Sequence, residues 1–137
     1  MNRVQTEDFD INDEIAALTE GRSDIGAVVS FTGLVRDVTL TLEHYAGMTE
    51  RELDKLEAAA NARWQLQGVT ILHRIGTLHP GDNIVLVVTA SKHRKDAFEA
   101  AEFLMDYLKT RAPFWKREGE EWVEAKDSDD EAAKRWK

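Results

Sequence analysis

Four basic side chains gather around one proline near the end of the chain. Lys109 and Arg111 precede Ala112-Pro113, and Lys116 and Arg117 follow it. The chain as a whole is acidic, with a formal net charge of -8, so this local cluster of cations repels itself unless an anion, a salt-bridge partner or solvent relieves it. The cluster is therefore a candidate site for a small anion such as a phosphate.

Each lysine also has a purely structural explanation. Lys109 stands in the last turn of a predicted helix, where the helix dipole favours cations. Lys116 falls on a predicted strand, where side chains alternate between faces, and it points with Phe114. Because the proline breaks the helix between the two lysines, a pocket shared by both requires the chain to turn back at Ala112-Pro113.

Two further basic groups are candidates for anion binding. His93 and Arg94 lie in the run Ser91-Lys-His-Arg-Lys95, between a predicted strand and the N-terminus of a predicted helix, where free N–H groups attract anions. A solvated loop explains the same run equally well. Arg36, at the end of a glycine-containing strand, is a weaker third candidate.

The remaining histidines and the known short motifs give no other site. His44 and His73 share strand faces with apolar residues, which predicts packed, hydrogen-bonded core histidines, whereas His79 precedes a turn and is predicted to be exposed. No pair of residues has compelling zinc or calcium spacing, and there is no phosphate-binding glycine loop or nucleophile elbow. Neither a metal nor a cofactor is expected.

Apolar periodicity and turn residues outline the elements that must position these groups. Three helices are predicted, running from Asp10 to Gly21, from a capping box at Thr49 to Trp64, and from about Ala97 to Arg111, where Pro113 ends the helix. Strands are predicted at Gly26–Val35, Leu40–Tyr45 as its neighbour, Val69–Ile75, Asn83–Ala90, Phe114–Glu118 and Trp122–Glu124, the last two as a hairpin.

Two details of these elements bear on the architecture. Pro80-Gly81 suits the centre of a type II turn. The strand Asn83–Ala90 is apolar on both faces, which predicts a central or covered position. Its segment Ile84–Val88 and the large side chain of Trp136 could also serve a subunit interface.

Length and composition set the class of the protein. The 137 residues predict a single domain, 1–137, with a charged C-terminal tail at 126–137. Strand pairs followed by single helices indicate an α+β fold with a mixed or antiparallel sheet and about three helices. The chain has no cysteine, no membrane-length apolar run and no signal-peptide core, so we expect a soluble cytoplasmic protein that binds no membrane. Its acidity argues against nucleic-acid binding.

Several segments, in order along the chain, resemble the large, catalytic subunit of molybdopterin synthase. They are Phe31-Thr-Gly-Leu-Val-Arg36, Leu42-Glu-His-Tyr-Ala-Gly-Met-Thr-Glu50, His73-Arg-Ile-Gly76, Pro80-Gly-Asp82, His93-Arg94, Met105-Asp-Tyr-Leu-Lys-Thr-Arg-Ala-Pro-Phe-Trp-Lys-Arg-Glu118 and Trp122-Val-Glu-Ala125. The segment that contains Lys109 and Lys116 is long and specific. The resemblance extends from about Gly26 to Trp136.

The resemblance implies an activity and a set of partners. The family converts cyclic pyranopterin monophosphate into the molybdopterin dithiolene, with sulfur from the C-terminal Gly-Gly thiocarboxylate of a small ubiquitin-like subunit. It has an α/β-hammerhead-like fold and forms a homodimer within a heterotetramer. By position, Lys109 and Lys116 match its active-site lysines, and Arg36, His93 and Arg94 match its basic substrate-binding residues. Lys109 is then expected beside the thiocarboxylate, while Lys116 helps to hold substrate and intermediate.

The chain departs from the family's pattern at one place. Only Asp37-Val38-Thr39 separate Arg36 from Leu40, where the family usually has a longer loop. Either the loop is truly short or part of it is missing from this sequence. The pose of Arg36 depends on that loop.

Two other functions compete with this interpretation. One is a non-catalytic adaptor that binds a ubiquitin-like partner, against which the presence of both Lys109 and Lys116 speaks. The other is an RNA-binding or nucleotide-binding module that uses the basic clusters with Phe114 and Trp115, against which the acidic net charge speaks.

Overall fold

The computed structural model describes residues 1–111, 114–118, 121–123 and 133–136. Their main elements are two β-sheets and three helices. In chain order the elements are β1 (Asn2–Gln5), α1 (Ile11–Thr19), β2 (Ala27–Leu34), β3 (Leu40–His44), α2 (Met48–Arg63), β4 (Leu66–Arg74), β5 (Gly76–Leu78), β6 (Asn83–Ser91), α3 (Arg94–Arg111), β7 (Phe114–Glu118) and β8 (Glu121–Val123). The predicted α+β class is confirmed.

The larger sheet has the strand order β1-β4-β6-β2. Strand β1 is parallel to β4, whereas β4 and β2 are both antiparallel to β6. The predicted central strand is confirmed, because β6 lies between two partners and its residues Val85–Ala90 are buried. The prediction that Ile84–Val88 could serve a subunit interface is therefore wrong for Val85–Val88, because their side chains are buried in the core of the same chain.

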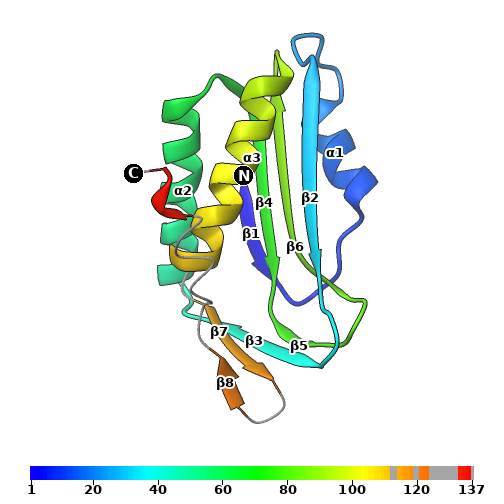
Figure 1. Cartoon of the computed structure of the whole chain (residues 1–137). Helices are drawn as coiled ribbons and strands as arrows, with labels where there is room; N and C mark the ends of the chain where they lie inside the picture. Colours follow the sequence, from blue (N-terminus) through cyan, green and yellow to red (C-terminus); the bar gives the residue numbers. More distant parts are fainter. Residues whose placement is uncertain (112–113, 119–120, 124–132, 137) are drawn as a thin grey trace.

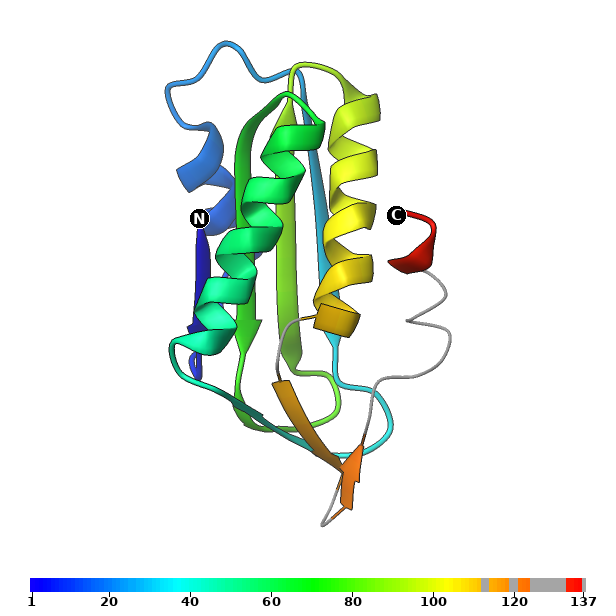
Figure 2. The same cartoon turned by 90° about the vertical axis from the view of Figure 1, so that its left-hand side faces the viewer.

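Helices cover both faces of this sheet (Figures 1 and 2). Helices α2 and α3 pack side by side on one face, over a core that includes Leu53, Ile71 and Leu104. Helix α1 lies on the opposite face, where Ile15 and its apolar neighbours pack on Leu72 and two other buried strand residues. The alternation of side chains along β4 and β6 supplies both apolar faces, as expected for a covered sheet.

The smaller sheet, with the order β5-β3-β7-β8, lies at one end of the larger one (Figure 1). The predicted hairpin of β7 and β8 is confirmed. The expectation that Leu40–Tyr45 pairs with the preceding strand is wrong, because β3 pairs with β5 and β7 instead. A tight turn, closed by the Val38 N–H donating to the Arg36 carbonyl at 2.8 Å, carries the chain from one sheet to the other. Leu42 and Leu78 are buried in a second, smaller hydrophobic core.

Most element boundaries follow the sequence signals. Asp10 caps α1 by accepting from the Asp13 N–H, and α3 ends at Arg111 as the proline requires. Gly81 has a φ of 94°, and the Asp82 N–H donates to the His79 carbonyl at 2.9 Å, which confirms the type II turn. The second helix differs from the prediction.

Helix α2 begins two residues earlier than the Thr49 capping box indicated. Its N-cap is Gly47, with a φ of 86°, and the Glu50 carboxylate accepts a hydrogen bond from the Gly47 N–H. Thr49 instead accepts from the Tyr45 N–H through its hydroxyl, at 3.1 Å, and is fully buried. The hydroxyl thus ties the end of β3 to the start of α2.

The last described turn, residues 133–136, lies beside α3 (Figure 2). Trp136 makes edge-to-face contacts with Trp64 and Phe103, at centroid distances of 5.8 and 5.6 Å. Trp136 is thus part of the intramolecular core rather than a free interface residue. The predicted solvated run at 126–131 lies outside the described residues. Within the described ranges, no helix is both long and apolar enough to cross a membrane.

Candidate active site

Lys109 is positioned by the C-terminal end of α3. The helix ends two residues later, at Arg111, while Leu104 and Leu108 hold its inner side in the core. The side chain of Lys109 is exposed, at the end of the larger sheet where the smaller sheet is attached. Unsatisfied carbonyl groups at a helix C-terminus favour a cation here.

Lys116 is positioned by the pairing of β7 with β3. It lies directly opposite Leu42, which is buried, and two residues after Phe114, so all three side chains share the inner face of the smaller sheet. Lys116 is half-buried, and Trp115 on the opposite face is exposed. The lysine is therefore not the ordinary exposed strand residue that the simplest interpretation of the sequence allowed.

His73 packs against the strand that carries Lys116. Its imidazole stacks on the ring of Phe114 with a centroid distance of 3.8 Å and an interplanar angle of 17°. Burial lowers the pKa of His73 to about 4, against the opposing effect of its hydrogen bond to the Arg74 carbonyl, and Lys109 and His44 lower it further electrostatically. Phe114 of β7 thus lies against a ring that is close enough to Lys109 of α3 to feel its charge, and Lys116 follows two residues later on the same strand face as Phe114.

His44 adds a second polar contact to the corner. Its Nε2 lies 3.0 Å from Oε1 of Glu50, at the start of α2. His44 also pairs with Phe114 across the β3–β7 ladder, on the same face as Lys116. The predicted packed and hydrogen-bonded environment is confirmed for His73, while His44 is paired with Glu50.

Arg36 lies at the same end of the larger sheet but points into solvent. Hydrogen bonds from the Val35 N–H to the Asp82 carbonyl and from the Gly81 N–H to the Val35 carbonyl fix the chain just before it. The Arg36 side chain is 81% exposed and lies 3.5 Å from the Asp37 carboxylate, whose own backbone has a φ of 71°. Its position in the described structure is adjacent to the lysine corner rather than inside it.

His93 and Arg94 lie at the other end of α3. Arg94 is the first residue of the helix, 15 residues before Lys109, which is about 22 Å at 1.5 Å per residue. Both side chains are exposed, and the His93 N–H donates to the Ser91 hydroxyl at 3.4 Å. Within one chain, therefore, His93 and Arg94 do not line the same cavity as Lys109.

Comparison with known proteins decides the family. The family model described as "MoaE protein" matches residues 4–111. The chain belongs to the MoaE family. It is 61% identical to the molybdopterin synthase catalytic subunit of Mesorhizobium japonicum, over 98% of this chain and 92% of the relative, and 57% identical to that of Yersinia pestis, over 98% and 95%. The expected resemblance is confirmed.

Solved MoaE structures have the same fold. The MoaE protein of Burkholderia ambifaria superposes with a TM-score of 0.89 at 53% identity, covering 99% of this chain and 97% of that chain. A molybdopterin synthase from Staphylococcus aureus gives a TM-score of 0.77 at 34% identity, covering 88% and 90%. The chain is accordingly a catalytic subunit of molybdopterin synthase, an enzyme of molybdenum cofactor biosynthesis that transfers sulfur.

The comparison also bears on the short link after Arg36. The alignment with the Mesorhizobium japonicum protein extends over 146 positions, although this chain has 137 residues, so at least nine positions of that MoaE relative have no counterpart here. A longer loop in the relative would account for them. In this chain the link from Arg36 to Thr39 is a closed turn, as described above.

A groove of about 410 Å³ lies between β2 and α3. It is lined by Val29, Ser30, Phe31, Phe98, Ala101, Glu102 and Met105. Phe98 is 59% exposed and Phe31 is 42% exposed, and β2 is an edge strand. Within the parts of the chain described, no group of three or more histidine, aspartate or glutamate side chains is arranged to hold a metal ion.

Proposed function

We propose that this MoaE chain converts cyclic pyranopterin monophosphate into the molybdopterin dithiolene at the corner formed by Lys109 and Lys116. The sulfur comes from the C-terminal thiocarboxylate of a small ubiquitin-like subunit, in a cytoplasmic heterotetramer of two catalytic and two small subunits. The observation that supports the proposal is that His73 is under the electrostatic influence of Lys109 and stacks on Phe114, which shares its strand face with Lys116.

The charge of the corner suits these reactants. The substrate carries a phosphate and the tail of the partner is anionic, so cations are needed to hold the two close together. Addition of the thiocarboxylate sulfur to a carbonyl carbon of the substrate forms a C–S bond while the carbonyl π electrons move to the oxygen, which takes up a proton and later leaves as water. The tail stays attached through an acyl–sulfur bond. Attack of water on that acyl carbon then breaks the bond, returns the tail as a carboxylate and leaves the sulfur on the substrate.

Each lysine has a role in this sequence. Lys109, exposed at a helix end, stands beside the incoming thiocarboxylate and stabilises the negative charge of the tetrahedral intermediates, and it transfers protons. Lys116, half-buried on the inner face of the smaller sheet, holds substrate and intermediate. A dithiolene needs two sulfur atoms, so two tails are consumed for each product.

The distant basic residues enter the site through a homodimer. The groove between β2 and α3 exposes Phe98 and Phe31, and a second copy covering it would bury them. A two-fold axis perpendicular to α3 reverses the direction of this helix in the second copy. Arg94 and Lys109 are equidistant from the point between Ala101 and Glu102, two residues that line the groove.

A dimer axis at that midpoint therefore places His93 and Arg94 of the second copy beside Lys109 of the first. Arg36 already lies at the Lys109 end of its own chain. In this arrangement Arg36, His93 and Arg94 bind the phosphate or the pterin, as their match to the family's substrate-binding residues implies. The separation of about 22 Å between Arg94 and Lys109 within one chain is then compatible with a shared site.

Complementation between inactive variants tests the shared site. Lys109→Ala and Arg94→Ala are purified separately, mixed under conditions that allow subunit exchange, and assayed with thiocarboxylated partner and precursor. Half of the random dimers then carry one intact site, so about one quarter of wild-type activity is expected. No recovery in demonstrably mixed dimers would show that the site is not shared. Wild-type chain that binds the partner but forms no dithiolene would favour an adaptor.

A further inference from the structure

His73 connects the larger sheet to the strand that carries Lys116. It is the penultimate residue of β4 and pairs with Val85 of the central strand β6, so its backbone is anchored in the larger sheet. Its ring lies flat against Phe114, the first residue of β7, at 3.8 Å. The contact therefore joins two sheets that are otherwise linked by turns and by the small core of Leu42 and its neighbours.

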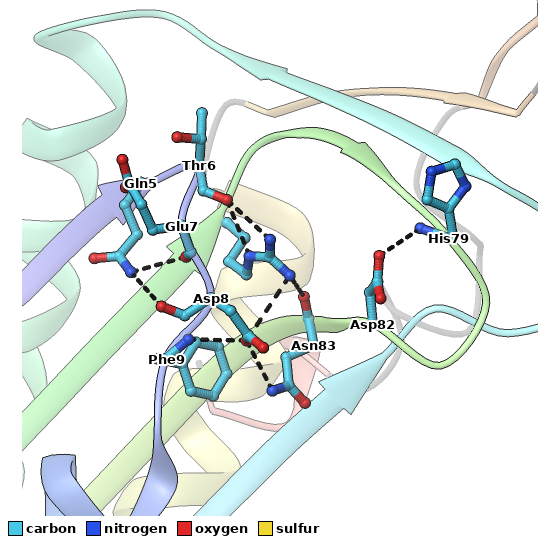
Figure 3. A network of polar contacts seen from close by, with 9 residues as sticks. Gln5, Thr6, Glu7, Asp8, Phe9, His79, Asp82 and Asn83 are labelled. Atoms are coloured by element: carbon cyan, nitrogen blue, oxygen red, sulfur yellow. Dashed lines mark hydrogen bonds and ion pairs between the residues drawn. The ribbon is translucent and has the colours of Figure 1, made fainter.

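The orientation of the imidazole is fixed by a backbone group. Nδ1 lies 2.8 Å from the Arg74 carbonyl oxygen, and because a carbonyl only accepts, Nδ1 carries the hydrogen. The Arg74 side chain ties this strand end to two neighbouring segments, because its guanidinium donates to the carbonyl oxygens of Thr6 and Asn83 (Figure 3). Asp8 lies 3.8 Å from the same guanidinium and accepts from the Asn83 amide at 2.9 Å.

The Nδ1 hydrogen bond orients the His73 ring, and Phe114 packs against its face. Phe114 is five residues after Lys109 and two residues before Lys116, on the same strand face as Lys116. The position of β7 relative to the end of α3 therefore depends on how Phe114 is seated. Pairing with β3 fixes the strand within the smaller sheet, and the stack on His73 fixes it relative to the larger sheet.

We infer that His73 is a positioning residue for sulfur transfer, which sets the placement of Lys116 relative to Lys109 by seating Phe114. The inference rests on the proposed function of the two lysines. A flat, uncharged ring suits this task, because a third cation beside Lys109 would repel it and the planar contact restricts Phe114 more than a branched aliphatic side chain does. His73 itself need not touch the substrate.

The test compares His73→Phe, which keeps a flat ring, with His73→Leu, which keeps apolar volume but not the ring. In His73→Leu, kcat should fall about tenfold or more, because a displaced catalytic group loses its alignment. The KM of His73→Leu for the thiocarboxylated partner should stay within about twofold of the wild-type value. The interface with a folded partner buries far more surface than the ring of one residue, so the loss of this ring should change partner binding little. His73→Phe keeps the stacked ring but loses the hydrogen bond to the Arg74 carbonyl, so kcat should fall by no more than about threefold, much less than in His73→Leu.

Ile71→Val, on the same face of β4 two residues away, is the control for destabilisation without a change at Phe114. All variants are assayed at a temperature where each is fully folded. Wild-type kcat in His73→Leu, an equal loss in His73→Phe, or an equal loss in Ile71→Val would each overturn the positioning role. If wild type itself forms no dithiolene, the proposed function fails instead.

Discussion

Acidification should destabilise the protein through His73 by an amount that the structure sets. Burial holds the pKa of His73 at about 4 in the folded chain, below the ordinary value of 6.5 that it regains on unfolding. The folded state therefore binds fewer protons than the unfolded state between these two values. The stability that His73 contributes is complete above pH 6.5 and is lost as the pH falls from 6.5 towards 4.

The size of the effect follows from the shift. A difference of about 2.5 pKa units corresponds to about 3 kcal/mol when the loss is complete, at 1.36 kcal/mol per unit. Between pH 7 and pH 5 the expected loss is about 2 kcal/mol, because the unfolded imidazole is almost fully protonated at pH 5 while the folded one is still neutral.

Urea unfolding of wild type and His73→Phe, at one fixed protein concentration and a series of pH values, measures this contribution. Carboxylates titrate in both proteins, so their effect cancels in the difference between the two free energies of unfolding. Wild type should lose about 2 kcal/mol relative to His73→Phe between pH 7 and pH 5. A difference that stays constant over this range would refute a buried neutral His73, and a difference of opposite sign would indicate a raised pKa.

Three further substitutions test the fold and the dimer. Gly26→Ala should lower the free energy of unfolding, measured in urea, by about 2 kcal/mol or more, because an added Cβ would stand 2.2 Å from the Lys92 carbonyl oxygen and the backbone would have to move. Unchanged stability would contradict this close approach. Phe98→Asp should convert the proposed dimer to a monomer, as measured by light scattering, while Ala58→Asp on the exposed side of α2 should leave the mass of the dimer unchanged. Equal masses for the two variants would show that Phe98 does not lie in the interface. Trp136→Ala should lower the free energy of unfolding by about 2 kcal/mol through loss of its aromatic contacts, and a neutral result would mean that the last turn does not contribute to the core.

The elements with strong local signals were predictable from sequence. Pro113 fixed the end of α3 at Arg111, and the continuous apolar run of β6 indicated its central place. The sheet to which β3 belongs was not predictable, because alternation shows which face of a strand is apolar but not which strand it pairs with. The start of α2 was misplaced because Thr49 and Gly47 both carry N-cap signals, and tertiary burial of Thr49 decided between them.

The candidate site was predictable only in part. The lysines were found from their types and from the family motif, and helix geometry alone would have shown that Arg94 and Lys109 lie at opposite ends of α3. The role of His73 was not visible, since its neighbours Phe114 and Lys109 are more than 30 residues away in sequence and meet it only in the folded chain. Periodicity could show that His73 faces inward, but not what lies over it.

The most direct test of the account is the single-turnover rate of dithiolene formation by Lys109→Ala with thiocarboxylated partner and cyclic pyranopterin monophosphate. The control is Lys55→Ala, at an exposed position of α2 that is distant in sequence from both Lys109 and Lys116. Loss of the cation beside the thiocarboxylate should slow the reaction about 100-fold or more, while Lys55→Ala reacts at the wild-type rate. A near-normal rate for Lys109→Ala would contradict the assignment of sulfur transfer to this corner.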